Sequence, residues 1–267
     1  MDVLKRTYTA LVLIVLVFIC IHFLPSFWFF LFLQLLVLAA LMEFYSLSFK
    51  KKISPQRAFG FLSAFLIGLS FYFKAMTLEL ALFLCLLSAS LYFLIAFNSR
   101  EKIPQFTSSI AVTIFGALYL GFTLNFFYFI REEWGRFYVY FLLAVVFLGD
   151  TGAYFIGKFL GRHKQVPAAS PNKTWEGSAA GFIFAALGAF ATQRLFLPGI
   201  ILWKALLCGL LVHGVAQISD PLESLFKRAA EVKDSSRLLP GHGGFLDRID
   251  SLILAAPFFY FFIRFFW

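Results

Sequence analysis

Charged residues are scarce in this sequence of 267 residues. Asp, Glu, Lys and Arg make up 14% of the chain, whereas 61% of it is hydrophobic and 39 residues are Phe. Soluble domains contain about 25% charged residues and roughly 45–50% apolar ones. A soluble core of this length cannot hide so much apolar surface. We therefore exclude a soluble globular protein and predict an all-α polytopic membrane protein.

Cysteine is rare as well, and the sequence has neither repeats nor low-complexity tracts. Cys20, Cys85 and Cys208 all fall inside apolar runs that are far apart, which excludes a disulfide framework and a Cys/His zinc site. No linker separates two halves of the chain. We expect a single membrane-embedded domain over residues 1–267. Residues 1–106 form N-terminal helices with little functional signal, and residues 107–267 supply catalytic helices and loops.

Apolar stretches long enough to cross a bilayer recur along the chain. A spanning helix needs about 20 mostly apolar residues, and Pro25 separates the first two stretches. The N-terminus resembles a signal peptide, but no small-residue cleavage site precedes Pro25, so we count it as a span. The nine predicted spans are residues 7–24, 27–48, 58–75, 78–97, 107–130, 138–158, 178–196, 199–218 and 250–266.

Lysine and arginine are unevenly distributed between the two sides that nine spans define. One side, with the N-terminus and the loops 49–57, 98–106, 159–177 and 219–249, carries 17 of the 23 Lys and Arg residues. Cytoplasmic loops are enriched in these residues. We therefore predict a cytoplasmic N-terminus and an external C-terminus. The net charge of +9 belongs to this bias, so we expect no nucleic-acid partner.

The most polar stretch lies between the last two spans. Ser219 to Asp250 contains four Asp, five Lys or Arg and a Gly-His-Gly-Gly turn. Carboxylates hold hard cations, basic side chains hold phosphate, and glycines let backbone N–H groups approach an anion. This combination predicts a metal–phosphate site, although some of its parts also have structural explanations.

Those structural explanations concern the acids and the histidine. Asp220 precedes Pro221 and Glu223, a pattern that predicts a helix starting there with Asp220 as its N-cap. Asp247 and Asp250 are three residues apart on one face of the last span, where they either hold a cation or interact with the helix dipole. His242, between glycines, is either a turn residue or a ligand.

Two earlier segments lie on the same predicted side of the membrane. Asp150 falls within a span, where an acid is costly, so it is a functional candidate; alternatively it pairs with Lys158 near the interface. In the loop 159–177, Pro167 and Pro171 forbid a continuous helix. Its residues Lys173 and Thr174 suit phosphate, but the loop could equally be a basic interfacial segment.

Three of these segments resemble a known family. Ser224 to Asp250 is similar to the signature of the phosphatidate cytidylyltransferases, or CDP-diacylglycerol synthases. Ser170–Gly177 and Gly149–Tyr154 resemble that family's other recurring segments, in the same order. The first hundred residues carry no such likeness. One difference is Ser219, where the family pattern leads us to expect Gly; Ser suits this place if the backbone needs no positive φ.

The resemblance implies an enzyme that transfers CMP from CTP to phosphatidate, giving CDP-diacylglycerol and pyrophosphate, with one or two Mg²⁺ ions. The expected catalytic residues and metal ligands are Asp220, Asp247 and Asp250, with Asp150 and Asp234 as second choices. The expected substrate-binding residues are Ser170, Lys173, Thr174, Lys227, Arg228, Lys233, His242, Gly243, Gly244 and Arg248.

The expected partners are CTP, phosphatidate and membrane lipids, and a homodimer is left open. The expected location is the inner or plasma membrane of a bacterium, with the active site at the cytoplasmic face. Lys227 and Arg228 are consecutive on a helix and point about 100° apart, so we expect only one of them to face the CTP triphosphate together with Lys173. Arg248 is then expected nearer the phosphatidate.

Two other functions are weighed against this one. A CTP-dependent polyprenol or lipid kinase would use similar parts but transfer the γ-phosphoryl group and release CDP. A transporter would use Asp150 and the other acids as an ion path, but the charges gather at one membrane face and no symmetric pair of broken helices is evident. Gln193, His213 and Gln217 either line a lipid cavity or form hydrogen bonds between helices.

Overall fold

The computed structural model describes residues 2–50, 53–73, 75–236, 238 and 243–267. Almost all of the regular structure is helical, which confirms the prediction of an all-α membrane protein. In a bilayer each backbone N–H and C=O group must be bonded within the protein, and a helix satisfies these groups along a single apolar segment.

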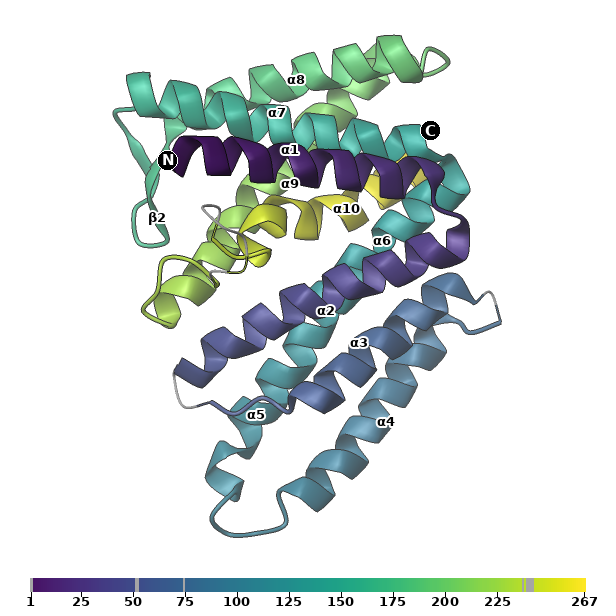
Figure 1. Cartoon of the computed structure of the whole chain (residues 1–267), viewed down its shortest axis with the longest axis vertical. Coiled ribbons are helices and arrows are strands. Elements are labelled where there is room, and N and C mark those ends of the chain that lie inside the picture. Colours follow the sequence, from purple (N-terminus) through teal and green to yellow (C-terminus); the bar gives the residue numbers. More distant parts are fainter. Residues whose placement is uncertain (1, 51–52, 74, 237, 239–242) are drawn as a thin grey trace. The chain divides into compact units, whose positions relative to one another are not determined.

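The helices follow the apolar stretches of the sequence (Figure 1). Those in the N-terminal half are α1 (Asp2–Phe23), α2 (Ser26–Lys50), α3 (Arg57–Tyr72), α4 (Leu78–Ala96), α5 (Ile103–Gly116), η1 (Ala117–Phe122), α6 (Thr123–Phe129) and η2 (Ile130–Trp134). The remaining elements are α7 (Arg136–Leu160), β1 (Lys164–Val166), β2 (Ser170–Thr174), α8 (Trp175–Phe196), α9 (Leu202–Ala229) and α10 (Leu246–Phe266).

Each of the nine predicted spans coincides with helix. Within the described residues, 7 helices are long and apolar enough to cross a membrane, counting α5 to η2 as one segment, Ile103–Trp134. The first and third predicted spans correspond to shorter apolar helices, Leu11–Phe23 and Arg57–Tyr72. The positions of the helices are thus as predicted, while the number of crossings and the sidedness of the termini stay predictions.

The course of α9 differs from the prediction. The sequence predicts a span that ends at residue 218 and a new helix capped by Asp220, but α9 continues without a break from Leu202 to Ala229. Pro221 lies inside this helix, where its missing N–H removes one i→i−4 hydrogen bond. The N-cap role of Asp220 is therefore wrong. Packing of α9 against its neighbours outweighs the local preference of proline for a first helical turn.

A short antiparallel hairpin joins α7 to α8. Strands β1 and β2 pair through Lys164 and Thr174 at one end and Val166 and Ser170 at the other. The exclusion of helix by the two prolines is confirmed. Thr174 then caps α8, because its hydroxyl accepts a hydrogen bond from Gly177 N at 3.2 Å.

Helices α7 and α8, which the hairpin connects, lie side by side (Figure 1). Glycine permits their close approach at the end next to the hairpin. A Cβ atom on Gly177 would lie 2.7 Å from the carbonyl oxygen of Ala153 and 3.0 Å from Cα of Gly157. Small residues commonly bring membrane helices together in this way. The crossing fixes where the hairpin, and with it Lys173, leaves the helical bundle.

Two compact units divide the described structure. The first unit comprises residues up to Tyr128 together with Asp234–Asp247, and the second comprises Phe129–Lys233 together with Arg248–Trp267. In the first unit, α2 packs against α3, α5 and η1. In the second, α9 packs against α7 and α8. Each unit contains buried acids of its own, and the single-domain organisation stays a prediction.

Candidate active site

In the second unit, the C-terminal half of α9 carries a stripe of polar side chains. Asp220, Glu223, Ser224 and Lys227 stand at i, i+3, i+4 and i+7, so they share one face of the helix. Glu223 is 0% exposed and Lys227 is 8% exposed. Because α9 is continuous, a single rigid element presents all four side chains.

Two lysines pair with this stripe. Lys227 Nζ lies 2.5 Å from Glu223 Oε2, and Lys173 Nζ lies 2.8 Å from Asp220 Oδ2. The first pair is almost fully buried, whereas the second is about one-quarter exposed. Lys173 comes from β2 of the hairpin, so its ion pair connects the hairpin to α9. The sequence prediction that Lys173 and Asp220 belong to one site agrees with this geometry.

Two further acids join the same group. Asp150, on α7, is hydrogen-bonded by the Ser251 side chain and feels the charges of Asp220 and Lys173. Asp250, on α10, feels the charges of Asp220, Glu223 and Lys227. Four acids (Asp150, Asp220, Glu223 and Asp250) and two lysines (Lys173 and Lys227) are therefore linked by ion pairs or by their charges. Neighbouring carboxyl groups that repel one another take up either protons or cations, so this acid–lysine cluster can accept a metal ion or another cationic partner.

Ser219 holds the helices of the cluster together. Its hydroxyl is fully buried and donates to the carbonyl oxygen of Asp250, while Leu254 N approaches the same hydroxyl at 3.4 Å. Ser219 is helical, and the described non-glycine residues with positive φ do not include it. The condition under which Ser suits this position is thus met. Ser219 connects α9 directly to the backbone of α10 beside an acid of the cluster.

Arg228 points away from the face that Lys227 occupies. Arg228 Nε donates to the Ala169 carbonyl at 3.2 Å, and its NH1 group donates to the Val232 carbonyl at 3.3 Å. Lys227, by contrast, turns into the acid–lysine cluster. The predicted divergence of these two basic side chains is therefore observed, and Arg228 ties the hairpin to the end of α9.

The first unit contains an acid that the sequence analysis missed. Glu43 lies on α2, is 5% exposed and accepts four hydrogen bonds. The donors are the hydroxyls of Ser235 (2.7 Å) and Ser236 (2.6 Å) and the backbone N–H groups of Phe245 and Leu246 (2.9 Å each). The sequence did contain a signal for Glu43. It is an acid within a predicted span, and the same feature made Asp150 a functional candidate.

Asp247 belongs to the same unit and contacts the same loop. Its Oδ2 atom accepts hydrogen bonds from Gly244 N at 2.8 Å and from Ser235 N at 3.0 Å. Gly243 has φ of 81°, a conformation that favours glycine. The N–H group of the next residue, Gly244, is the one that donates to Asp247. We call the described residues of this segment (234–236, 238 and 243–247), with the carboxylates of Glu43 and Asp247 that accept their hydrogen bonds, the anchored loop.

The other predicted site residues are more dispersed. Ser170 is half-buried in β2, Thr174 is buried as the cap of α8, and Lys233, Asp234 and Arg248 are exposed. His242 lies outside the described residues. Among the described residues, no group of three or more His, Cys, Asp or Glu side chains could hold a metal ion by itself.

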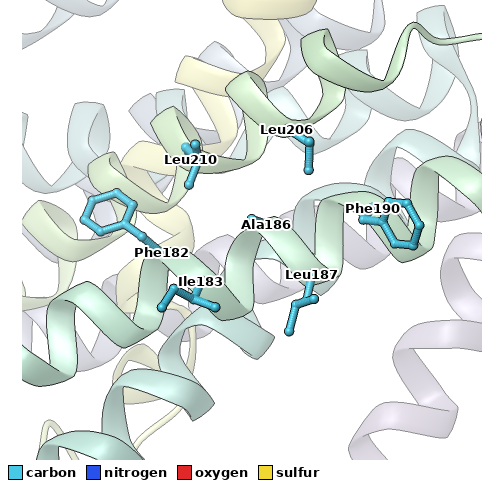
Figure 2. A pocket seen from close by; sticks show the side chains of 7 residues that line it. All are labelled: Phe182, Ile183, Ala186, Leu187, Phe190, Leu206 and Leu210. Carbon is cyan, nitrogen blue, oxygen red and sulfur yellow. The ribbon is translucent and has the colours of Figure 1, made fainter.

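The polar residues inside α8 and α9 form hydrogen bonds, of which the bond from Gln217 to Ser178 joins the two helices. Gln217 Nε2 donates to the carbonyl of Ser178 at 3.0 Å and lies 2.8 Å from His213 Nε2. Gln193 donates to the carbonyl of Ile200. Beside them, the two helices form a shallow groove of about 430 Å³ (Figure 2). Its lining is apolar: Phe182, Ile183, Ala186, Leu187, Phe190, Leu206 and Leu210.

Comparison with known proteins identifies the family. The model of the cytidylyltransferase family matches residues 4–266, nearly the whole chain. The chain belongs to the cytidylyltransferase family. It is 34% identical over 252 residues to the phosphatidate cytidylyltransferase of Staphylococcus haemolyticus, covering 94% of this chain and 95% of the relative.

Other relatives carry the same name. The phosphatidate cytidylyltransferase of Bacillus subtilis is 38% identical over 194 residues, which cover 71% of this chain and 69% of the relative. That of Staphylococcus epidermidis is 40% identical over 147 residues, 55% and 56% of the two chains. Together with the apolar helices, these bacterial relatives fit a multi-pass bacterial membrane protein. As a member of the family, the chain is a nucleotidyltransferase.

Proposed function

We propose that this member of the cytidylyltransferase family transfers CMP from CTP to phosphatidate, with release of pyrophosphate. The relatives named phosphatidate cytidylyltransferase support this substrate pair. The observation that carries the proposal is the acid–lysine cluster, in which Lys173 and Asp220 form an ion pair beside the further acids Asp150 and Asp250.

The reaction requires two anions to meet. A phosphate oxygen of phosphatidate attacks the α-phosphorus of CTP, the bond from that phosphorus to the bridging oxygen breaks, and pyrophosphate leaves with the electron pair. No covalent enzyme intermediate is needed, because the lipid itself is the nucleophile. Catalysis is then mainly positioning and charge stabilisation. Lys173 is the proposed contact to the triphosphate, since it reaches the cluster from the hairpin.

The cluster also suits a divalent cation. The family generally uses a divalent metal, and we propose Mg²⁺. Mg²⁺ usually binds one or two carboxylates together with substrate phosphates and water, so a site of three protein acids is unnecessary. Asp220 and Asp250 are the proposed carboxylates. When bound, the ion would neutralise charge on the triphosphate and on the leaving pyrophosphate.

The remaining assignments stay predictions. Asp247 as a metal ligand is one of them, because its Oδ2 atom already accepts hydrogen bonds from the anchored loop. Asp150 and Asp234 stay second choices for the metal. The same status holds for contacts to substrate by Ser170, Thr174, Lys227, Arg228, Lys233, His242, Gly243, Gly244 and Arg248. A cytoplasmic active-site face and a homodimer are likewise predictions.

The decisive experiment measures which phosphate of CTP is transferred to the lipid. Purified protein in mixed micelles with phosphatidate and Mg²⁺ receives CTP labelled either at the α-phosphate or at the γ-phosphate. We expect lipid-bound label only from α-labelled CTP and labelled pyrophosphate from γ-labelled CTP. Label in the lipid from γ-labelled CTP would instead establish a lipid kinase. No labelled lipid from either nucleotide would refute both transferase and kinase.

A further inference from the structure

The carboxylate of Glu43 lies in an unusual place for an acid of a membrane helix. It is buried on α2, and its four bonded partners in the described structure are neutral groups of the anchored loop. About 190 residues of sequence separate it from that loop. An acid inside an apolar helix is costly unless it is well bonded, so its presence points to a specific task.

The four hydrogen bonds hold both ends of the loop. Ser235 and Ser236 lie at the start of the anchored loop, whereas Phe245 and Leu246 lie at its end. Each oxygen of Glu43 accepts one hydroxyl and one backbone N–H, so a single planar group joins the two ends. Leu246 is also the first residue of α10, where free N–H groups favour a negative charge.

We call the Glu43 carboxylate with its four hydrogen bonds the clamp. The clamp also sets the position of Gly244. A Cβ atom there would lie 1.9 Å from Ser235 Oγ and 2.5 Å from Glu43 Oε2, so the backbone packs directly against the clamp. Asp247 accepts from Gly244 N and Ser235 N on the same side. Gly243, Gly244 and Asp247 are among the residues of the first unit for which contacts to the triphosphate or its cation are predicted. Their geometry therefore depends on Glu43.

We propose that Glu43 is a positioning residue for CTP, which fixes the anchored loop in the shape that receives the triphosphate. This inference rests on the proposed function, because it assumes that the loop meets CTP. Glu43 itself contacts no substrate. Its carboxylate acts through the backbone of Gly244 and the first turn of α10.

The substitution Glu43→Gln tests the clamp with little change of volume. A Gln amide has one acceptor oxygen, so its NH₂ group would face a hydroxyl and a backbone N–H that now lack their acceptor. Gln34→Leu is the matched control: it lies buried on the same helix and loses one hydrogen bond, Gln34 Nε2 to Asn125 Oδ1 at 2.7 Å, without touching the loop.

Hydrogen–deuterium exchange gives a readout that does not depend on turnover. We expect the amides of Phe245 and Leu246 to exchange at least tenfold faster in Glu43→Gln than in the natural sequence, and to be unchanged in Gln34→Leu. Unchanged exchange in Glu43→Gln would refute the clamp, whatever reaction the enzyme catalyses. This arm therefore separates failure of the clamp from failure of the proposed function.

Steady-state kinetics then tests the positioning role. We expect Glu43→Gln to raise the KM for CTP at least fivefold and to leave the KM for phosphatidate within twofold, because only the nucleotide meets the loop. A merely structural defect would lower the active fraction and leave both KM values unchanged. That result, or an equal rise in both KM values, would overturn the proposal.

A second variant covers the case in which Glu43→Gln does not fold. Replacing Ser235 and Ser236 together by Ala removes two of the four donors and keeps the carboxylate with both backbone N–H groups. We expect the same selective rise in the KM for CTP, by about threefold. Natural KM values in this double variant would equally overturn the proposal.

Discussion

The two units hold their carboxylates in opposite ways. In the first unit, Glu43 and Asp247 accept hydrogen bonds from hydroxyls and backbone N–H groups of one loop. In the second unit, Asp220 and Glu223 pair with lysines, and other acids lie beside them. Neutral donors that converge on a carboxylate fix the shape of a loop. An excess of acids over lysines instead leaves carboxyl groups that take up protons or cations.

This difference assigns different tasks to residues of the same type. Burial of a carboxylate is tolerated when donors satisfy it, as the four hydrogen bonds of Glu43 do. The acid–lysine cluster is not balanced in this way, since the acids outnumber the lysines. We therefore place the chemistry in the second unit and the shaping of the loop in the first. The following substitutions test that division, in order of decreasing effect.

Asp220→Asn should have the largest effect. It removes one negative charge from the proposed metal site and the partner of Lys173, so we expect turnover to fall about 10³-fold, a loss typical of a group that stabilises developing charge. The pair is partly exposed, so the folded state should lose only about 0.5–1 kcal/mol. Radiolabelled lipid formation and thermal unfolding in detergent measure the two effects.

We expect Asp220→Asn to lose activity but to stay folded. Should Asp220→Asn keep more than one-tenth of the natural turnover, Asp220 would be a structural residue and the division of tasks would be wrong. Loss of both folding and activity would place Asp220 with Glu43, as an acid that serves structure.

Lys227→Met should cost the most stability in the second unit. It leaves Glu223 buried without the ammonium group that lies 2.5 Å away, and breaking a buried ion pair in this way costs about 3–5 kcal/mol. Combining it with Glu223→Leu removes both charges and should restore most of that stability. Equilibrium unfolding of the single and double variants measures the difference.

The double variant also shows whether Lys227 serves stability alone or binds phosphate as well. If Lys227 serves only the ion pair, the double variant regains turnover together with stability. If Lys227 also binds phosphate, as its position in the sequence predicts, stability returns but turnover does not, and we expect the latter outcome.

Ser219→Gly should have an intermediate effect. The substitution removes the hydroxyl that donates to the Asp250 carbonyl and places glycine inside α9, each at about 1 kcal/mol. We expect the stability to fall by about 1–2 kcal/mol in unfolding experiments and turnover to stay within threefold. A larger loss of turnover would show that the tie between α9 and α10 orients the acid directly.

Glu176→Gln should have the smallest effect. Glu176 lies 2.5 Å from His163, whose side chain is 78% exposed, so solvent screens the pair and its contribution to stability is small. We expect natural turnover and an unfolding temperature within a few degrees of the natural one. A strong loss of activity would extend the site beyond the acid–lysine cluster.

The sequence allowed the helical class and the helix positions to be predicted, because apolar length is a local signal. It also indicated that Lys173 and Asp220 belong to one site, but as a phosphate contact and a metal ligand and not as an ion pair. The start of a helix at Asp220 was wrong, because tertiary packing keeps α9 helical through Pro221. The β1–β2 hairpin has strands too short to show a period-2 pattern.

Glu43 illustrates a second limit of prediction from the sequence. Its role depends on partners 192 to 203 residues away, so no local pattern reveals that role, although Glu43 lies inside an apolar stretch. Likewise, that Lys227 turns toward the acids and Arg228 toward backbone carbonyls depends on how α9 is rotated. Sequence predicted that the two side chains diverge but could not decide which one faces the cluster.

A Mg²⁺ titration of lipid labelling at saturating CTP tests the division of tasks most directly. It compares the natural sequence with Asp220→Asn and Glu43→Gln. We predict that Asp220→Asn stays near zero at every Mg²⁺ concentration. Glu43→Gln should reach at least one-third of the natural maximum, with a half-saturating Mg²⁺ concentration within twofold of the natural one. The account would be contradicted if Asp220→Asn responded to Mg²⁺ like the natural sequence while Glu43→Gln did not respond.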